Sequence, residues 1–190
     1  MNQLRWMRPI GACFTLIFMV TGCLSYDTTP PEVSKQPAII LDVSKVEVYG
    51  VRGGEQVSLM QPTVEKLTAE WLTQRIQYTG TGKKRMVIDI DEASMVQNPK
   101  SSKPVFDAFT SRIALSFKLY GEDGHLAERT MRMNMSITRE MEKDPSIAIR
   151  DTFFASMGKA IVSSLDQKVP PQVKEEFPEL LTRTHYVEIH

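Results

Sequence analysis

The sequence contains little cysteine and no excess of charge of either sign. Its cysteines are Cys13 and Cys23, and 23 Lys and Arg balance 23 Asp and Glu in 190 residues. Balanced charge argues against nucleic acid as a partner, because phosphate binding requires an excess of basic side chains. With so few thiols, the fold must be stable through its hydrophobic core and not through a disulfide framework.

Histidine is equally scarce, which limits the catalytic chemistry that the chain can support. The three histidines are His125, His185 and His190, and no pair of them has the spacing of a metal site or a catalytic triad. No serine lies in a nucleophile elbow. The sequence therefore predicts no catalytic residue, no metal and no cofactor.

Two segments invite a ligand-binding interpretation and are better explained by structure. In "YTGTGKK", residues 78–84, Gln77 stands where a phosphate loop has its first glycine, and the segment is expected to follow a helix. It predicts a helix-ending turn. Asp89 and Asp91, followed by Glu92, resemble a cation site, but alternation with isoleucines places both aspartates on the solvent side of a strand.

The N-terminus has the pattern of an export signal. Arg5 and Arg8 precede an apolar run, residues 10–20, that is too short to span a bilayer as a helix. The run ends in Val-Thr-Gly-Cys, which resembles the lipobox of bacterial lipoproteins. That resemblance implies a diacylglyceryl group on the Cys23 thiol, cleavage before Cys23 and acylation of the new amine.

Two other interpretations of this segment stay open: an ordinary apolar leader with an incidental cysteine, or a short membrane anchor that is never cut. If cleavage occurs, residues 1–22 are lost together with Cys13, so the mature chain cannot form an internal disulfide. Loss of Arg5 and Arg8 from the 23 basic residues leaves 21 against 23 acidic ones.

Proline content and periodicity divide the rest of the chain into three parts. Residues 23–37 are predicted to be the lipidated N-terminus and a flexible tether, and residues 38–168 an α+β domain. Residues 169–190 are predicted to be a proline-interrupted C-terminal tail whose Phe177, Leu180 and Leu181 pack back onto the domain.

Alternation of apolar and polar residues predicts four strands. The first alternates over residues 39–43 and resumes out of phase over 46–48, as a bulge near Lys45 would produce; the second covers residues 86–90. The other two form an antiparallel hairpin around the turn at 121–124. Its apolar parity comprises Phe109, Ile113, Leu115, Phe117 and Leu119, with Ser111 among them, and Met131, Met133, Met135 and Ile137.

Two helices complete the predicted domain. Pro62-Thr63 opens the first, with Val64, Leu67, Trp71 and Leu72 on its apolar side and Gly80 and Gly82 at its close. In the second, Asp144 is the predicted cap and Pro145 the first residue. Its buried stripe is Phe154, Met157, Ile161 and Leu165. The order βαβββα predicts a two-layer α+β sandwich, a four-stranded sheet with both helices on one face.

Two features are candidates for binding. Met131, Met133 and Met135, with Met86 and Met157 expected nearby, form an adaptable apolar layer that serves either as ordinary core or as a lipid-binding interior. The uncovered sheet face is mixed in charge and serves either as a solvated surface or as a partner-docking face. Its candidate docking residues are Arg112, Lys118 and Arg132.

The lipobox, the tether and the βαβββα layout resemble small periplasm-facing lipoproteins of Gram-negative bacteria, notably the auxiliary lipoproteins of ABC-type transporters and the lipopolysaccharide-assembly lipoprotein. Trp71, late in the first helix, fits the former group. The resemblance implies a non-enzymatic accessory or adaptor subunit with an envelope protein partner. The alternative is a periplasmic lipid carrier. Leu24, where an aspartate signals inner-membrane retention, favours the outer membrane over the inner membrane.

Overall fold

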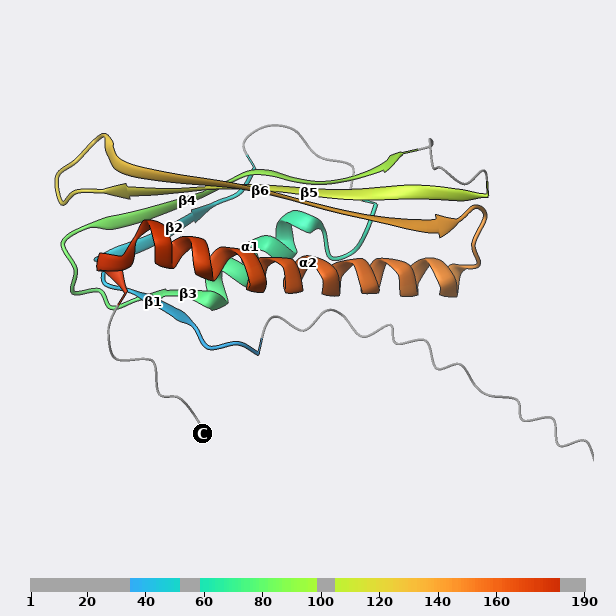
Figure 1. Ribbon diagram of the computed structural model, residues 1–190, viewed down its shortest axis with the longest axis horizontal. Helices are drawn as coiled ribbons and strands as arrows, with labels where there is room; N and C mark the ends of the chain where they lie inside the picture. The colour runs from blue at the N-terminus through green and yellow to red at the C-terminus, as the bar shows by residue number, and fades with distance from the viewer. Residues whose placement is uncertain (1–34, 52–58, 99–104, 182–190) are drawn as a thin grey trace, which may run out of the picture.

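The computed structural model describes residues 35–51, 59–98 and 105–181, and within them it is a two-layer α+β sandwich. The elements are β1 (Ile39–Leu41), β2 (Lys45–Tyr49), α1 (Val64–Arg75), β3 (Ile76–Tyr78), β4 (Arg85–Asn98), β5 (Phe106–Tyr120), β6 (Ala127–Glu142), α2 (Ile147–Glu176) and the 3-10 turn η1 (Pro178–Leu180). The main sheet has the order β2-β4-β5-β6, and both helices lie on one face of it (Figure 1). The predicted fold class is confirmed.

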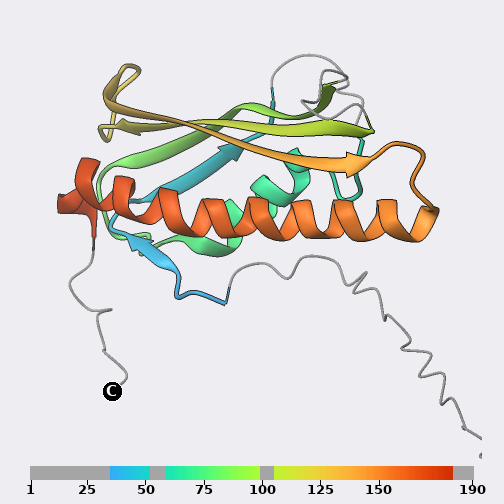
Figure 2. The ribbon, with the colours of Figure 1, turned by 45° about the vertical axis from the view of Figure 1, so that its right-hand side comes forward.

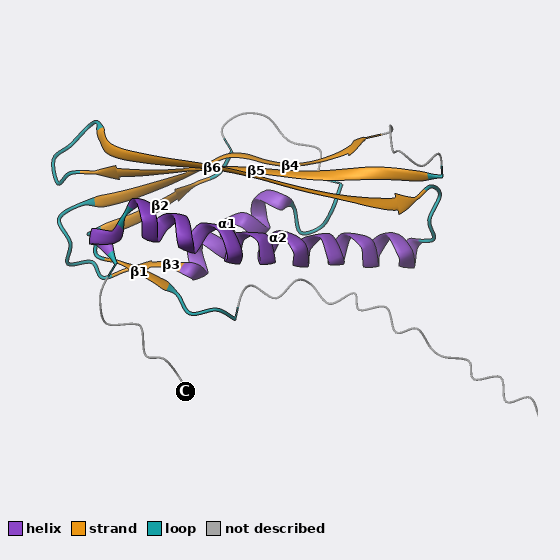
Figure 3. Ribbon diagram, viewed as in Figure 1, coloured by secondary structure: helices purple, strands orange, loops and turns teal. Residues whose placement is uncertain are grey.

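The β5–β6 hairpin confirms the predicted parity. The two strands are antiparallel, with Leu115 opposite Met133. Met131, Met133 and Met135 are at most 5% exposed, whereas Arg132 and Asn134 between them are exposed. Since successive strand residues point to opposite faces, this alternation aims one face of the hairpin at the helices, as Figure 3 shows.

The predicted first strand is wrong, because the segment forms two strands in two different sheets. β1 pairs in parallel with β3, and β2 pairs in parallel with β4. At the crossing, the backbone N–H of Asp42 donates to Leu180 and that of Ser44 donates to Lys84. The change of phase near Lys45 is therefore a change of sheet and not a bulge.

The glycine-containing turn at residues 79–84 joins two strands and does not end a helix. Helix α1 stops at Arg75, as its capping residue Ile76 begins the short strand β3. Gly80 has a φ of 78°, which favours glycine, and a Cβ on Gly82 would lie 2.3 Å from the Asp42 carbonyl oxygen. The strand β4 follows this turn, whereas a phosphate loop would be followed by a helix.

Helix α2 begins two residues later than predicted by the Asp144 cap. Ser146 is the N-cap, and its Oγ accepts a hydrogen bond of 3.3 Å from the N–H of Ile149. Asp144 instead has a φ of 54°, a left-handed conformation that aspartate tolerates better than most residues. Asp144 therefore belongs to the turn between β6 and α2.

The helix also continues past the predicted boundary at Lys168, through Pro170 and Pro171, to Glu176. A proline inside a helix costs about 3 kcal/mol, and burial of a large apolar side chain returns about 1.5–3 kcal/mol. Val169, Val173 and Phe177 are at most 1% exposed, and their burial, about 4.5–9 kcal/mol together, offsets the roughly 6 kcal/mol cost of two prolines. The predicted tail therefore begins as core structure, and Phe177 and Leu180 pack onto the domain as expected.

A buried polar link joins the two helices. Asp166 Oδ1 on α2 accepts hydrogen bonds of 3.0 Å from Trp71 Nε1 and 3.2 Å from Arg75 Nε. The Arg75 side chain is 5% exposed, and one terminal guanidinium nitrogen, buried, has no partner in the described part of the chain. Asp166 is thus the counterion that lets α1 place an arginine in the interior.

Candidate functional site

The predicted lipidation site, Cys23, lies outside the described residues and stays a prediction. The described part of the chain does place the three candidate docking residues. Arg112 and Lys118 on β5 and Arg132 on β6 have the parity opposite to the buried residues, so all three lie on the sheet face away from the helices. Their role as a docking face stays a prediction.

One charge of that face is neutralised locally. Lys118 Nζ lies 2.7 Å from Asp89 Oδ2, and Asp89 is 7% exposed, so the expectation that Asp89 is solvated was wrong. The hydrogen bond to Asp89 raises the pKa of Lys118, against a lowering effect of desolvation. Asp91 is exposed as expected and accepts a hydrogen bond from Ser116. Asp89 is therefore an ion-pair partner on this face.

The methionine layer is closed core. Met86 and Met157 are fully buried, as are their neighbours on β6, and the cluster includes residues of both helices. Ser164 on α2 lies 3.7 Å from the sulfur of Met135. Met60 and Met141, which sequence reasoning did not single out, line a cavity.

That cavity lies at one end of the sheet and is absent from the predictions. It has a volume of about 850 Å³ and lies between the first turns of α2, residues 59–62 before α1, and the ends of β4, β5 and β6. Helix α1 is short, and at the right-hand end in Figure 2 only α2 runs beneath the strands. The cavity therefore lies where the sheet is covered by α2 but not by α1.

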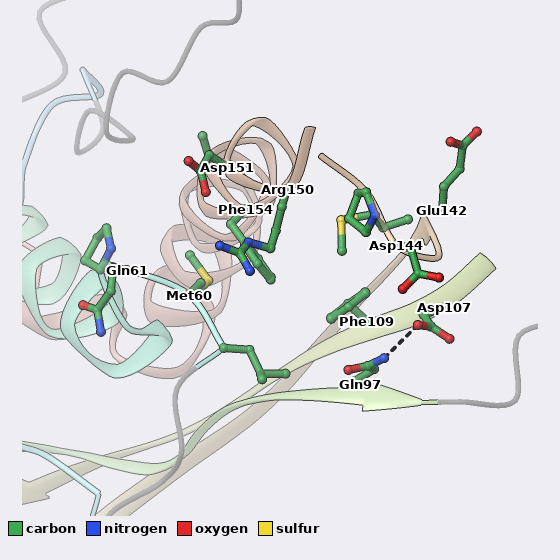
Figure 4. A pocket seen from close by; sticks show the side chains of 15 residues that line it. Met60, Gln61, Gln97, Asp107, Phe109, Glu142, Asp144, Arg150, Asp151 and Phe154 are labelled. Atoms are coloured by element: carbon green, nitrogen blue, oxygen red, sulfur yellow. Dashed lines mark hydrogen bonds between the residues drawn. The ribbon is translucent and has the colours of Figure 1, made fainter. Parts of the chain in front are cut away.

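Apolar side chains form the floor of this sheet-end cavity. Figure 4 shows Phe109 extending from β5 and Phe154 from α2, and both line the cavity together with Met60. The ring centroids of Phe109 and Phe154 are 5.8 Å apart at 90°, an edge-to-face contact, and Phe153 lies 5.2 Å from Phe109. Such a packed aromatic cluster gives the floor a defined shape.

Carboxylates surround the mouth of the cavity. Asp107, Glu142, Asp144 and Asp151 line it, against a single cationic lining residue, Arg150. Asp107 has the parity of Phe109, so it lies on the helix-facing side of β5, where its Oδ2 accepts a 2.8 Å hydrogen bond from Gln97. Among the described residues, the other three carboxylates have no hydrogen bond or ion pair. The mouth is therefore acidic, and these three carboxylates are not neutralised by ion pairs with other described residues.

Exposed apolar residues lie next to this mouth. Val105 is 61% exposed, Ile147 71% and Ile149 40%. The carbonyl of Val105 accepts a hydrogen bond from the backbone N–H of Lys143, which lies between Glu142 and Asp144 in the chain. The two isoleucines lie in the first turn of α2. Large apolar side chains gathered beside a cavity are typical of a binding surface. Ile147 lies seven residues before Phe154, on the line of the predicted stripe of α2, but it is exposed, and Ile149 lies off that stripe. These two isoleucines are the signal that sequence reasoning missed.

Within residues 35–51, 59–98 and 105–181, no group of three or more His, Cys, Asp or Glu side chains is arranged to hold a metal ion. In the same ranges, no helix combines the length and apolar composition needed to cross a membrane.

No known family model matches this chain, and no curated protein matches its sequence. Its fold is similar to solved bacterial lipoprotein structures. Rare lipoprotein B from Shewanella oneidensis has a TM-score of 0.43 and 10% identity, over 69% of this chain and 97% of that one. A minor lipoprotein from Acinetobacter baumannii has a TM-score of 0.42 and 12% identity, over 74% of this chain and 96% of that one.

Lipoprotein B from Nitrosomonas europaea has a TM-score of 0.45 and 12% identity, over 78% of this chain and 96% of that one. All three proteins are lipoproteins by name. At such TM-scores and identities, the likeness establishes neither a family nor a function for this chain.

Proposed function

We propose that this protein is a lipid-anchored, non-enzymatic accessory or adaptor subunit of a cell-envelope assembly or lipid-transport system. The observation that carries the proposal is the sheet-end cavity, which combines an apolar floor, an open acidic mouth and exposed apolar neighbours. Such a surface suits the binding of another molecule. The Val-Thr-Gly-Cys pattern supplies the second element, a covalent anchor that would hold this surface near a membrane.

The anchor is tested by Cys23→Ala. We expect this variant to accumulate as an uncleaved precursor that incorporates no labelled fatty acid, because Cys23 is the thiol at the predicted cleavage site. Gel mobility and metabolic labelling with a fatty acid measure both effects. Cys13→Ala is the matched control and should be processed normally. Normal labelling of the Cys23 variant would exclude the lipobox interpretation.

Localisation is part of the same proposal. Leu24 favours the outer membrane, with the domain facing the periplasm, and the periplasmic side of the inner membrane is the alternative. Several acyl chains, each methylene contributing about 0.8 kcal/mol, would make the attachment essentially permanent.

A second candidate function is a lipid carrier. The predicted methionine-lined interior is closed, but Met60 and Met141 line the sheet-end cavity and give it an adaptable wall. A lipid that co-purifies with the protein would favour the carrier. A stable complex with a membrane protein would favour the accessory function.

Affinity purification from native membranes tests the accessory function and locates its surface. We expect the tagged, lipidated protein to retain a membrane-protein partner, and Ala155→Trp to lose it, because Ala155 lines the cavity and the indole would fill it.

Replacing Arg112, Lys118 and Arg132 together with serine tests the opposite sheet face. Mass spectrometry identifies the partners. Full recovery by both variants, at unchanged yield and physiological salt, would exclude both surfaces.

A further inference from the structure

The chemistry of the sheet-end cavity restricts what it can bind. Its volume of about 850 Å³ falls in the range of ligand-binding pockets, about 300–1,000 Å³, so it can take several bulky apolar side chains. The floor is apolar because Phe109 and Phe154 meet there, and Met60 and Met141 supply flexible thioethers. The floor therefore selects for a ligand with an apolar group but does not determine the net charge of that ligand.

The mouth sets the charge. Four carboxylic acids and one arginine line the cavity, and Lys143, which lies between Glu142 and Asp144 in the chain, is not among the lining residues. Glu142, Asp144 and Asp151 have no ion pair in the described part of the chain, and Arg150 is the basic side chain among the described lining residues. An anionic ligand would be repelled by this mouth, and a cationic one attracted.

This arrangement of carboxylates is not suited to binding a metal ion. The carboxylates surround an opening and do not converge, since the described residues hold no cluster of three potential ligands that fits a metal. In Figure 4, Asp107, Glu142 and Asp144 lie on the side of the strand ends, whereas Asp151 lies on α2. Carboxylates spread around an apolar floor suit a ligand in which several cationic groups surround an apolar centre.

We propose that the sheet-end cavity binds a basic amphipathic segment of a partner protein, with its large apolar side chains on the phenylalanine floor and its lysines or arginines against the acidic mouth. This inference rests on the proposed accessory function and specifies its partner. Val105 and Ile147, exposed beside the mouth, extend the apolar contact beyond the cavity. A short helix that presents anchors three and four residues apart has the required shape.

The test is photocross-linking of the full, lipidated chain in native membranes. Benzoylphenylalanine replaces Ile147, which is 71% exposed beside the mouth and leaves the cavity itself open. Mass spectrometry identifies the segment that becomes cross-linked. We expect a protein segment with apolar residues at helical spacing and a net positive charge. A neutral or acidic segment, or a lipid, would overturn the inference.

Charge variants provide the quantitative arm. Glu142→Gln, Asp144→Asn and Asp151→Asn together should lower the cross-linking yield about tenfold, the combined effect of three exposed charge contacts. The matched control makes the same change in net charge at Glu122, Asp123 and Glu175, which are exposed and do not line the cavity. This control should leave the yield unchanged. The wild-type yield should also fall as salt is raised, because the Debye length shrinks from about 8 Å at 0.15 M to about 3 Å at 1 M.

The outcomes separate the two proposals. If the acidic-mouth variant and high salt leave a protein cross-link at full yield, the cavity binds a partner without charge selection, and only the present inference fails. If no protein cross-links at Ile147 under any condition, the inference fails together with the assignment of partner binding to this cavity.

Discussion

Met133→Asp is expected to lower the free energy of unfolding by about 4 kcal/mol, because the variant must bury an unpaired carboxylate or protonate it. Met133 is 4% exposed and lies opposite Leu115, which is fully buried, on the helix-facing side of the hairpin. The buried base of the described residues, Arg75, is already paired with Asp166 and does not compensate the new charge.

Denaturant unfolding followed by tryptophan fluorescence measures this loss, since Trp71 is fully buried. The matched control is Asn134→Asp, which adds the same charge one residue away on the opposite face. It should change stability by less than about 0.5 kcal/mol, as exposed substitutions usually do. Equal unfolding midpoints for the two variants would show that the parity of β6 is wrong.

Asp166→Ala is expected to destabilise the protein by about 3–5 kcal/mol, because it leaves the buried Arg75 guanidinium without its counterion. The same change removes the acceptor of the Trp71 indole N–H, which lies 3.0 Å from Asp166 Oδ1. The Asp166 side chain is only 17% exposed, so water cannot fully replace it.

A second substitution separates the charge effect from the loss of packing. Adding Arg75→Met to Asp166→Ala should recover much of the lost stability, because the interior then holds no unpaired charge. Glu70→Ala is the surface control: Glu70 is 43% exposed, its ion pair with Lys66 is 3.9 Å long, and its loss should cost less than about 1 kcal/mol. A double variant no more stable than Asp166→Ala would contradict this account.

Much of the fold could be predicted because the strongest patterns are local. In the β5–β6 hairpin, alternation continues through both strands, and a pleated strand has no other way to bury one side. The stripe of α2 was equally clear, since Met157, Ile161 and Leu165 repeat at helical spacing and are all fully buried.

The boundaries were less predictable, because contacts distant in sequence decided them. The segment around Lys45 alternates with one change of phase, which locally resembles a bulge, yet its two halves hydrogen-bond to different partners, β3 and β4. Pro170 and Pro171 read locally as a helix end, and only the burial of Val169 and Val173 in the core keeps α2 continuous. Asp144 likewise read as a cap, although Ser146 takes that position.

By itself the sequence determined the fold class, the parity of the hairpin, the buried stripe of α1 and that of α2 from Met157 to Leu165, whereas Phe154 is half-buried. Lipid attachment at Cys23 stays a prediction. Only the tertiary structure decided that Asp89 is a buried partner of Lys118 and that a cavity opens at one end of the sheet. The physical reason is range. Periodicity depends on neighbours a few residues apart, whereas the cavity combines Met60, Phe109 and Phe154, which become neighbours only when a short α1 leaves the end of the sheet to α2 alone.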